Sequence, residues 1–142
     1  MTSLTDAIAE LGGDFASLTV SERLNLLLEF SENLPEVPTR LAEHPDLLER
    51  VVECQSPIFL LVEVVDGFVN LHFTAPAEAP TTRGFASILY TLLNGRSVAE
   101  VLAAPDNIPD SLALSEAVSP LRLRGMRGML ARIKRQTAEK SA

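Results

Sequence analysis

The residue best suited to covalent chemistry in this 142-residue chain is Cys54, its only cysteine, within the run V-V-E-C-Q-S-P at positions 51–57. A lone thiol forms no intramolecular disulfide, and one sulfur is too little for a structural zinc site. Two interpretations remain open at this point. Cys54 is either a buried thiol that packs as a small apolar side chain, or a thiol that reacts with another molecule.

A cation that could assist such a thiol is Arg122, near the start of the last predicted helix. Ser119 at the cap and Pro120 at the first helical position favour a helix start there. Arg122 falls on the apolar stripe of this helix, so we expect it to face the core. A guanidinium near a thiol lowers its pKa and stabilises anionic sulfur. The alternative is a structural ion pair with Glu78 or Glu116. The stripe consists of Met126, Met129, Leu130 and Ile133.

Composition and charge narrow the classes of protein. The chain has 46% apolar and 22% charged residues, an ordinary globular balance, and its length suits one domain spanning residues 1–142. It contains neither a run long enough to span a membrane nor a basic N-terminal region followed by an apolar stretch, so we expect a cytoplasmic protein without membrane association. The last 24 residues hold seven Lys or Arg and one Glu, whereas residues 1–118 carry a net charge of −13. We expect the basic segment to pair with the acidic body rather than to bind nucleic acid.

The clearest structural signal is a β-hairpin over residues 56–75. Two apolar runs flank Asp66-Gly67, a dipeptide typical of a two-residue type I′ turn. This turn places the even-numbered residues of the first strand on one wholly apolar face, which helices must cover. If the chain stays extended back through Ser56, Cys54 shares that parity and lies near the edge of the helix–sheet core. The sequence therefore predicts an α+β fold: a small antiparallel sheet of about three strands with helices packed on one face.

The remaining elements follow from capping and periodicity. Residues 4–11 predict a short helix ended by Gly12-Gly13. Thr19 and Glu22 have capping-box spacing and predict a helix to about Asn33, with Leu24, Leu27 and Leu28 on one face. A short turn or helix is expected over 39–48, and further helices over 81–94 and 98–103, the second capped by Ser97.

A Cys–His hydrolase dyad is disfavoured. Under the hairpin register His72 lies on the face opposite Cys54, and His44 sits in a loop before Pro45. The chain contains no nucleophile-elbow motif, phosphate-binding loop or metal-ligand cluster.

Several short motifs, taken in order, resemble the SufE family of sulfur acceptors over about residues 14–137. They are Cys54-Gln55-Ser56 before an apolar strand and hairpin, then Arg83-Gly84 opening an apolar helix. The closing helix, with Arg122 three residues before Gly125-Met126, is also similar. Two departures stand out: Glu53 occupies a position where the family usually has glycine, and Ala77-Glu78-Ala79 replaces a Ser-Asp-Ala.

The resemblance implies a concrete function. Such proteins accept persulfide sulfur from a pyridoxal-phosphate-dependent cysteine desulfurase, stimulate it, and relay the sulfur for iron–sulfur cluster assembly, in some cases to a scaffold protein. They are transfer partners rather than stand-alone enzymes and need no metal or organic cofactor of their own. By match, Cys54 is the acceptor and Arg122 a buried supporting arginine; Gln55, Ser56, Arg83 and Glu53 complete the candidate site.

A rival from another class is a non-catalytic SufE-like module that binds or regulates a desulfurase, with Cys54 as a structural thiol. Every periodicity above is compatible with it, and Glu53 favours it. The residues leave open which desulfurase and which sulfur recipient are involved.

Overall fold

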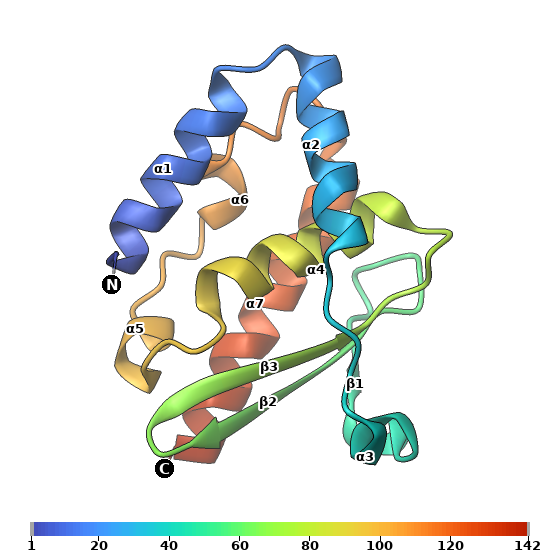
Figure 1. Cartoon of the computed structure of the whole chain (residues 1–142), viewed down its shortest axis with the longest axis vertical. Helices are drawn as coiled ribbons and strands as arrows, with labels where there is room; N and C mark the ends of the chain where they lie inside the picture. Colours follow the sequence, from blue (N-terminus) through green and yellow to red (C-terminus); the bar gives the residue numbers. More distant parts are fainter. Residues whose placement is uncertain (1, 142) are drawn as a thin grey trace.

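The computed structural model describes residues 2–141, which form seven α-helices, one 3-10 helix and one three-stranded antiparallel sheet (Figure 1). In chain order the elements are α1 (Leu4–Ala16), α2 (Val20–Glu32), α3 (Thr39–Ala42), the 3-10 helix η1 (Pro45–Leu47), β1 (Glu49–Arg50), β2 (Phe59–Val65), β3 (Phe68–Thr74), α4 (Pro80–Leu93), α5 (Val98–Leu102), α6 (Ile108–Ser111) and α7 (Pro120–Ser141). The predicted α+β class with a small antiparallel sheet is confirmed.

The β2–β3 hairpin has the predicted register. Phe59 faces Thr74, and Val65 faces Phe68 across the turn. Asp66 and Gly67 have φ values of 53° and 81°, the two positive angles that a type I′ turn requires. The face predicted to be apolar is buried, and its most enclosed residues are Ile58, Leu60, Val62, Val69, Leu71 and Phe73.

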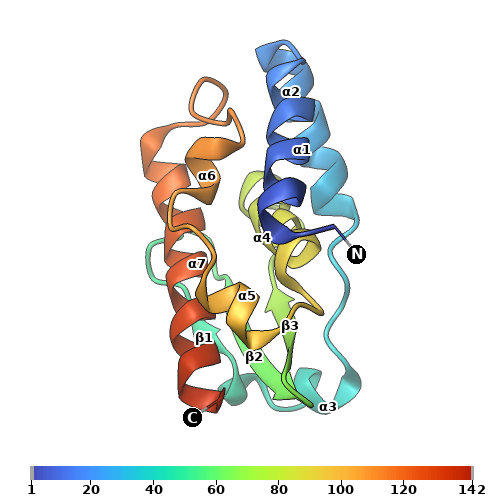
Figure 2. The ribbon, with the colours of Figure 1, turned by 90° about the vertical axis from the view of Figure 1, so that its left-hand side faces the viewer.

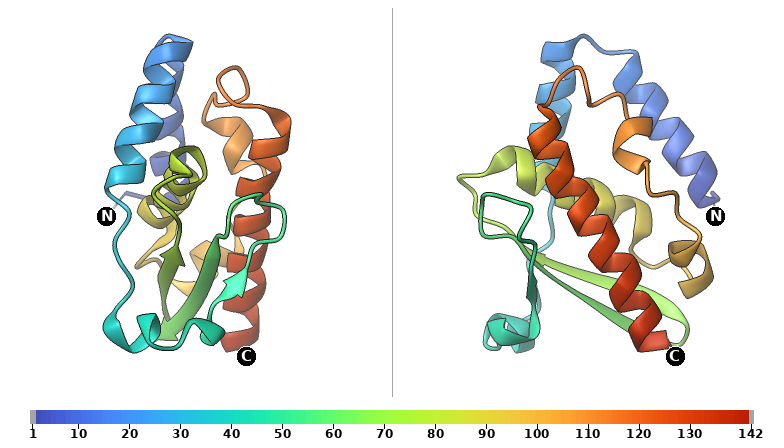
Figure 3. Two further views of the ribbon diagram at one scale, coloured as in Figure 1. Left: turned by 90° about the vertical axis from the view of Figure 1, so that its right-hand side faces the viewer. Right: turned by 180° about the vertical axis from the view of Figure 1, so that it is seen from behind.

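Helices α4 and α7 cover this buried face (Figure 2). Seen from behind, α7 crosses the hairpin diagonally, with the loop between β1 and β2 beside its N-terminal half (Figure 3). The predicted apolar stripe of α7 is buried: Met126, Met129 and Ile133 are each fully enclosed. The arrangement puts α7 under both the sheet and the loop that carries Cys54.

On both long edges of the hairpin, backbone groups form hydrogen bonds with side chains of other segments. On the β2 edge beyond β1, Val62 N–H donates to Gln136 Oε1 at 2.8 Å, and Lys140 Nζ donates to Val62 O. On the β3 edge, Leu71 N–H donates to Asn94 Oδ1 at 2.8 Å. Unpaired strand edges can pair with another chain and cause aggregation. These contacts occupy backbone groups that would otherwise be open on the edges of the small sheet.

Two helix predictions need correction. The first helix does not end at Gly12-Gly13 but continues to Ala16, because Gly12 packs directly against the backbone of Ser111 and is used for close approach rather than termination. In α2 the capping box of Thr19 and Glu22 is confirmed, and Leu27 is buried. Leu24 and Leu28 remain 37% and 40% exposed, so the stripe predicted for this helix is wrong at two positions.

The other local predictions agree with the structure. The 39–48 region contains α3 and η1, residues 80–93 form α4, and Ser97 accepts a hydrogen bond from Glu100 N–H to cap α5. The short helix α6 was not predicted. No helix within residues 2–141 is long and apolar enough to cross a membrane.

Four basic residues of α7 pair with carboxylates, as expected: Arg127, Arg132, Lys134 and Arg135. Arg127 contacts Asp110 at 2.6 Å, and Lys134 contacts Asp106 at 3.0 Å. These pairs are exposed and each contributes little stability.

Candidate functional site

Cys54 lies in the loop between β1 and β2, residues 51–58. Val51 N–H donates to Ile58 O at 2.9 Å and closes the loop at its base, while Cys54 N–H donates to Val51 O at 3.1 Å within it. Cys54 was predicted to lie near the edge of the helix–sheet core; the residue is 6% exposed and packs within the core cluster. The extended backbone expected between Cys54 and the strand is wrong, because residues 51–58 form a loop between β1 and β2.

The loop packs against α7 at two glycines, Gly125 and Gly128. A Cβ atom on Gly125 would lie 2.8 Å from Cys54 Sγ, and one on Gly128 would lie 2.8 Å from the carboxyl carbon of Glu53. Residues three apart on a helix share a face, so consecutive loop residues rest on consecutive helical turns. The loop therefore packs directly on the helix backbone.

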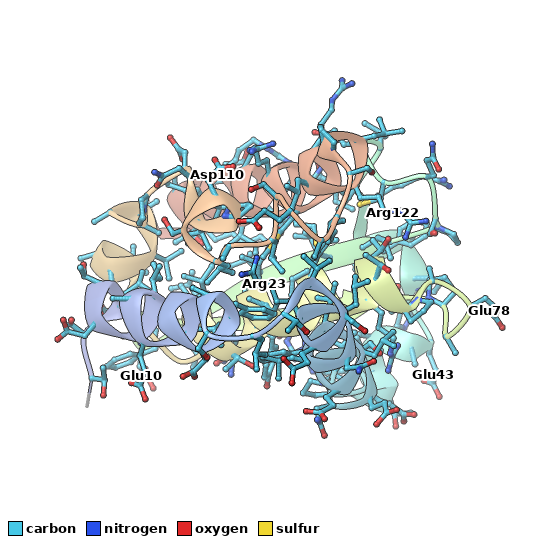
Figure 4. All side chains as sticks on the ribbon, turned by 90° about the horizontal axis from the view of Figure 1, so that it is seen from above. Glu10, Arg23, Glu43, Glu78, Asp110 and Arg122 are labelled. Carbon is cyan, nitrogen blue, oxygen red and sulfur yellow. The ribbon has the colours of Figure 1, made fainter. Side chains whose placement is uncertain are left out.

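Beside the thiol is a pocket of about 320 Å³. The loop contributes Gln55 and Ser56 in addition to Cys54. The other walls come from the first turns of α4 and α7, including Thr81, Thr82 and Leu121. Figure 4 shows Arg122 beside this loop, and Arg122 also lines the pocket. The structure thus brings together five of the predicted residues: Cys54, Gln55, Ser56, Glu53 and Arg122.

The surroundings keep the thiol neutral. Burial, followed by the negative charge of Glu53, raises the pKa of Cys54 to about 11, and the positive charge of Arg132 only partly offsets this. Glu53 itself is held ionised, because a hydrogen bond from Arg132 lowers the pKa of its carboxyl. In this position Cys54 is buried, and its raised pKa favours the neutral thiol.

The prediction that Arg122 faces the core is wrong. Its side chain is exposed, and within residues 2–141 it forms no salt bridge, either with Glu78 or with Glu116. Glu116 instead lies 3.6 Å from Arg23. The stripe of α7 meets the core only from Leu123 onward, because the turn before it borders the open pocket rather than a packed wall.

Arg83 is not part of the pocket. Its guanidinium donates to the carbonyl oxygens of Ser31 at 2.8 Å and Ala75 at 2.7 Å, which joins the end of α2 to the segment after β3. Buried carbonyls need such donors, so the geometry gives Arg83 a structural task.

His72 belongs to a separate cluster. Its Nε2 lies 2.8 Å from Glu63, which also binds Arg40 through both carboxylate oxygens. Neither His72 nor the exposed His44 lines the Cys54 pocket. Within residues 2–141 no group of three or more His, Cys, Asp or Glu side chains is placed to hold a metal ion.

Sequence reasoning missed Arg132. This residue of α7 reaches back to the loop and lies 2.8 Å from Glu53 Oε1. One signal was present: two glycines three apart in a helix cost stability unless another segment approaches there, and Arg132 lies on that same face, four residues after Gly128.

Comparison with known proteins identifies the family. The family model described as SufE, Fe-S metabolism associated domain, matches residues 9–137, and the chain belongs to this family. An uncharacterized SufE-like protein of Mycobacterium tuberculosis strain H37Rv is 52% identical over 138 residues, covering 96% of this chain and 95% of the relative.

Two further similarities are more distant. The sulfur acceptor protein CsdE of Escherichia coli K12 is 26% identical over 121 residues, covering 84% of this chain and 80% of CsdE. A solution structure of a hypothetical protein from Thermus thermophilus superposes with a TM-score of 0.81 at 36% identity, covering 97% of this chain and 95% of that one. The fold and the family are therefore established.

Proposed function

We propose that this protein is a sulfur acceptor, which takes persulfide sulfur from a cysteine desulfurase on Cys54 and relays it for iron–sulfur cluster assembly. The observation that carries the proposal is the position of the lone cysteine: a shielded thiol on a loop, beside a pocket of about 320 Å³ with Arg122 at its wall. Membership of the SufE family and similarity to a sulfur acceptor support it.

The transfer is a thiol–disulfide type of exchange. The Cys54 thiolate attacks the outer sulfur of the donor's persulfide, a new S–S bond forms on Cys54, and the donor's own S–S bond breaks. The donor cysteine leaves as a thiolate, and no external oxidant or reductant is consumed. The product is a persulfide on Cys54, which is ready for a second exchange of the same kind with a recipient.

The pocket offers anionic sulfur the guanidinium of Arg122 and two helix N-termini, although the carboxylates of Glu53 and Glu78 also line it. Residues of the first turns of both α4 and α7 line it, and helix N-termini favour negative charge. With a pKa of about 11, only about one Cys54 in 10,000 is ionised at pH 7 while buried. We therefore expect the loop to move the thiol into the pocket or into the partner during transfer.

The proposed surface for the desulfurase consists of exposed side chains of the Cys54 loop and of α7, around the pocket and the neighbouring groove. Val52 on the loop and Leu121 on α7 are 71% and 52% exposed. Arg122 and Arg124 are exposed cations on the same helix. Apolar side chains flanked by arginine are typical of interface hot spots.

Intact-mass analysis tests the proposal. After incubation with a cysteine desulfurase and L-cysteine, the wild-type protein should gain about 32 Da, the mass of one sulfur atom, which reducing agent removes. Cys54→Ser should gain nothing and should not stimulate the desulfurase, although its thermal unfolding stays near that of the wild type. Stimulation by the Ser variant at the wild-type level would refute transfer through Cys54.

A regulatory module without transfer is the second candidate. The observation favouring it is the raised thiol pKa, to which Glu53 contributes beside Cys54. Desulfurase binding without any mass gain would establish this alternative.

A further inference from the structure

We propose that Arg132 is a positioning residue, which holds Cys54 in its shielded position by an ion pair with Glu53. The Glu53–Arg132 pair, called the latch below, would set how often the loop opens. The role of the latch in sulfur transfer rests on the proposed function, whereas the latch itself is defined by the geometry of the loop.

The contacts of Arg132 join two parts of the same segment. Its Nη1 lies 2.8 Å from Glu53 Oε1 and donates to Oε2 at 3.0 Å, while its Nε lies 3.2 Å from Glu49 Oε2. The side chains of Arg132 and Glu53 are 15% and 24% exposed, so solvent screens this pair less than the surface pairs of α7. Arg132 therefore binds both β1 and the tip of the loop.

Few other contacts hold the tip. Val51 and Ile58, at the two ends of the loop, are fully buried and fix its base. Between them, Cys54 is the only buried residue. Gly125 and Gly128 offer the tip a smooth helix backbone rather than interlocking side chains. The latch and the packing of the Cys54 side chain are thus the main restraints on opening.

Two features of the latch lower the free-energy cost of separating Glu53 from Arg132. Glu53 Oε1 and Arg132 Nε are buried, and although each lies within ion-pair distance of an opposite charge, neither is aligned for a hydrogen bond. An unsatisfied buried polar atom is costly, so opening recovers hydration that offsets part of the lost pair. A groove lined by Val52, Arg124 and Arg127 opens onto the pair from the solvent side. Glu53 can therefore leave Arg132 without disturbing the core.

Alkylation of Cys54 by iodoacetamide at pH 8 tests the latch without any sulfur donor. Arg132→Gln and Glu53→Gln should each raise the rate about tenfold, and the double variant should match the single variants, since both remove one interaction. Arg135→Gln is the matched control: Arg135 also pairs with Glu49 but has no contact with Glu53. It should stay within about twofold of the wild type.

The sign of the Arg132→Gln effect separates the latch from simple electrostatics. Without a latch, this variant leaves an unpaired carboxylate beside the thiol, which would raise the thiol pKa and slow alkylation, whereas Glu53→Gln would speed it. Opposite signs for the two variants, or equal increases for Arg132→Gln and Arg135→Gln, would overturn the proposal. Arg132→Lys keeps a cation at the site and should restore most of the protection, which guards against loss of fold in the Gln variant.

Failure of the latch and failure of the proposed function remain distinguishable. Wild-type protein that gains sulfur while Arg132→Gln is alkylated no faster refutes the latch alone. Faster alkylation of Arg132→Gln, with no gain of about 32 Da in the wild type, refutes sulfur transfer alone.

Discussion

The replacement Gly125→Ala tests whether Cys54 rests against α7. The added Cβ would lie 2.8 Å from Cys54 Sγ, about 1 Å inside ordinary van der Waals separation. Overpacking of this kind costs about 1–3 kcal/mol, whereas Ala in place of Gly within a helix stabilises by about 0.5–1 kcal/mol. We expect a net loss of up to about 2 kcal/mol in the free energy of unfolding, measured by urea denaturation. Alkylation of Cys54 should also become faster, because the thiol is displaced.

The chain supplies a matched control in Gly13→Ala. Gly13 is also helical, but a Cβ there would meet no atom within 4 Å, so this variant should show only the gain in helix propensity. The two variants should differ by about 1–3 kcal/mol, which isolates the contact with the thiol. If Gly125→Ala stabilised the protein as much as Gly13→Ala and left alkylation unchanged, Cys54 would not be seated on Gly125.

Two further predictions follow from the positions of charged residues. Arg122→Ala should change the free energy of unfolding by less than about 0.5 kcal/mol, because the side chain is exposed. The variant should nevertheless stimulate the desulfurase less than the wild type, with the largest reduction at low ionic strength. Stimulation at the wild-type level at every salt concentration would show that Arg122 is not part of the site. Arg40, followed by His72, holds the pKa of Glu63 at about 2, below its ordinary 4.5. This pairing therefore stabilises the fold above about pH 4.5, and the effect is lost as pH falls toward 2. Glu63→Gln should lower the free energy of unfolding, measured by urea denaturation, by about 1 kcal/mol at pH 7. The difference in this free energy between the variant and the wild type should become smaller below pH 4, and a difference independent of pH would contradict the assignment.

The parts of the fold that were predictable depend on local rules. Asp66-Gly67 imposes the hairpin register because two adjacent residues with positive φ permit one turn type, and the register then decides which face is apolar. Thr19 and Pro120 marked the starts of α2 and α7 for a similar reason: the first turn of a helix has its own requirements for hydrogen bonds.

The errors arose where a local pattern met a tertiary contact. Gly12 reads as a helix stop, but a neighbouring backbone fills the space beside it and the helix continues. Arg122 was placed inward by helical phase, which is valid only while a packed wall faces the helix, and here the wall gives way to the pocket. On α2, helical phase also predicted burial of Leu24 and Leu28, which are 37% and 40% exposed.

The sequence by itself determined the candidate thiol, the hairpin and the face of the sheet that helices must cover, because a unique cysteine, a turn dipeptide and an alternating pattern need no partner to be recognised. Only the tertiary structure decided the state of that thiol. Glu53 and Arg132 are 79 residues apart, and nothing local links them. Their pairing depends on α7 crossing beneath the loop, with Gly125 and Gly128 close enough to admit Cys54 and its neighbour. A pKa is set by burial and by nearby charges, so the reactivity of Cys54 depends on contacts that exist only after the chain has folded.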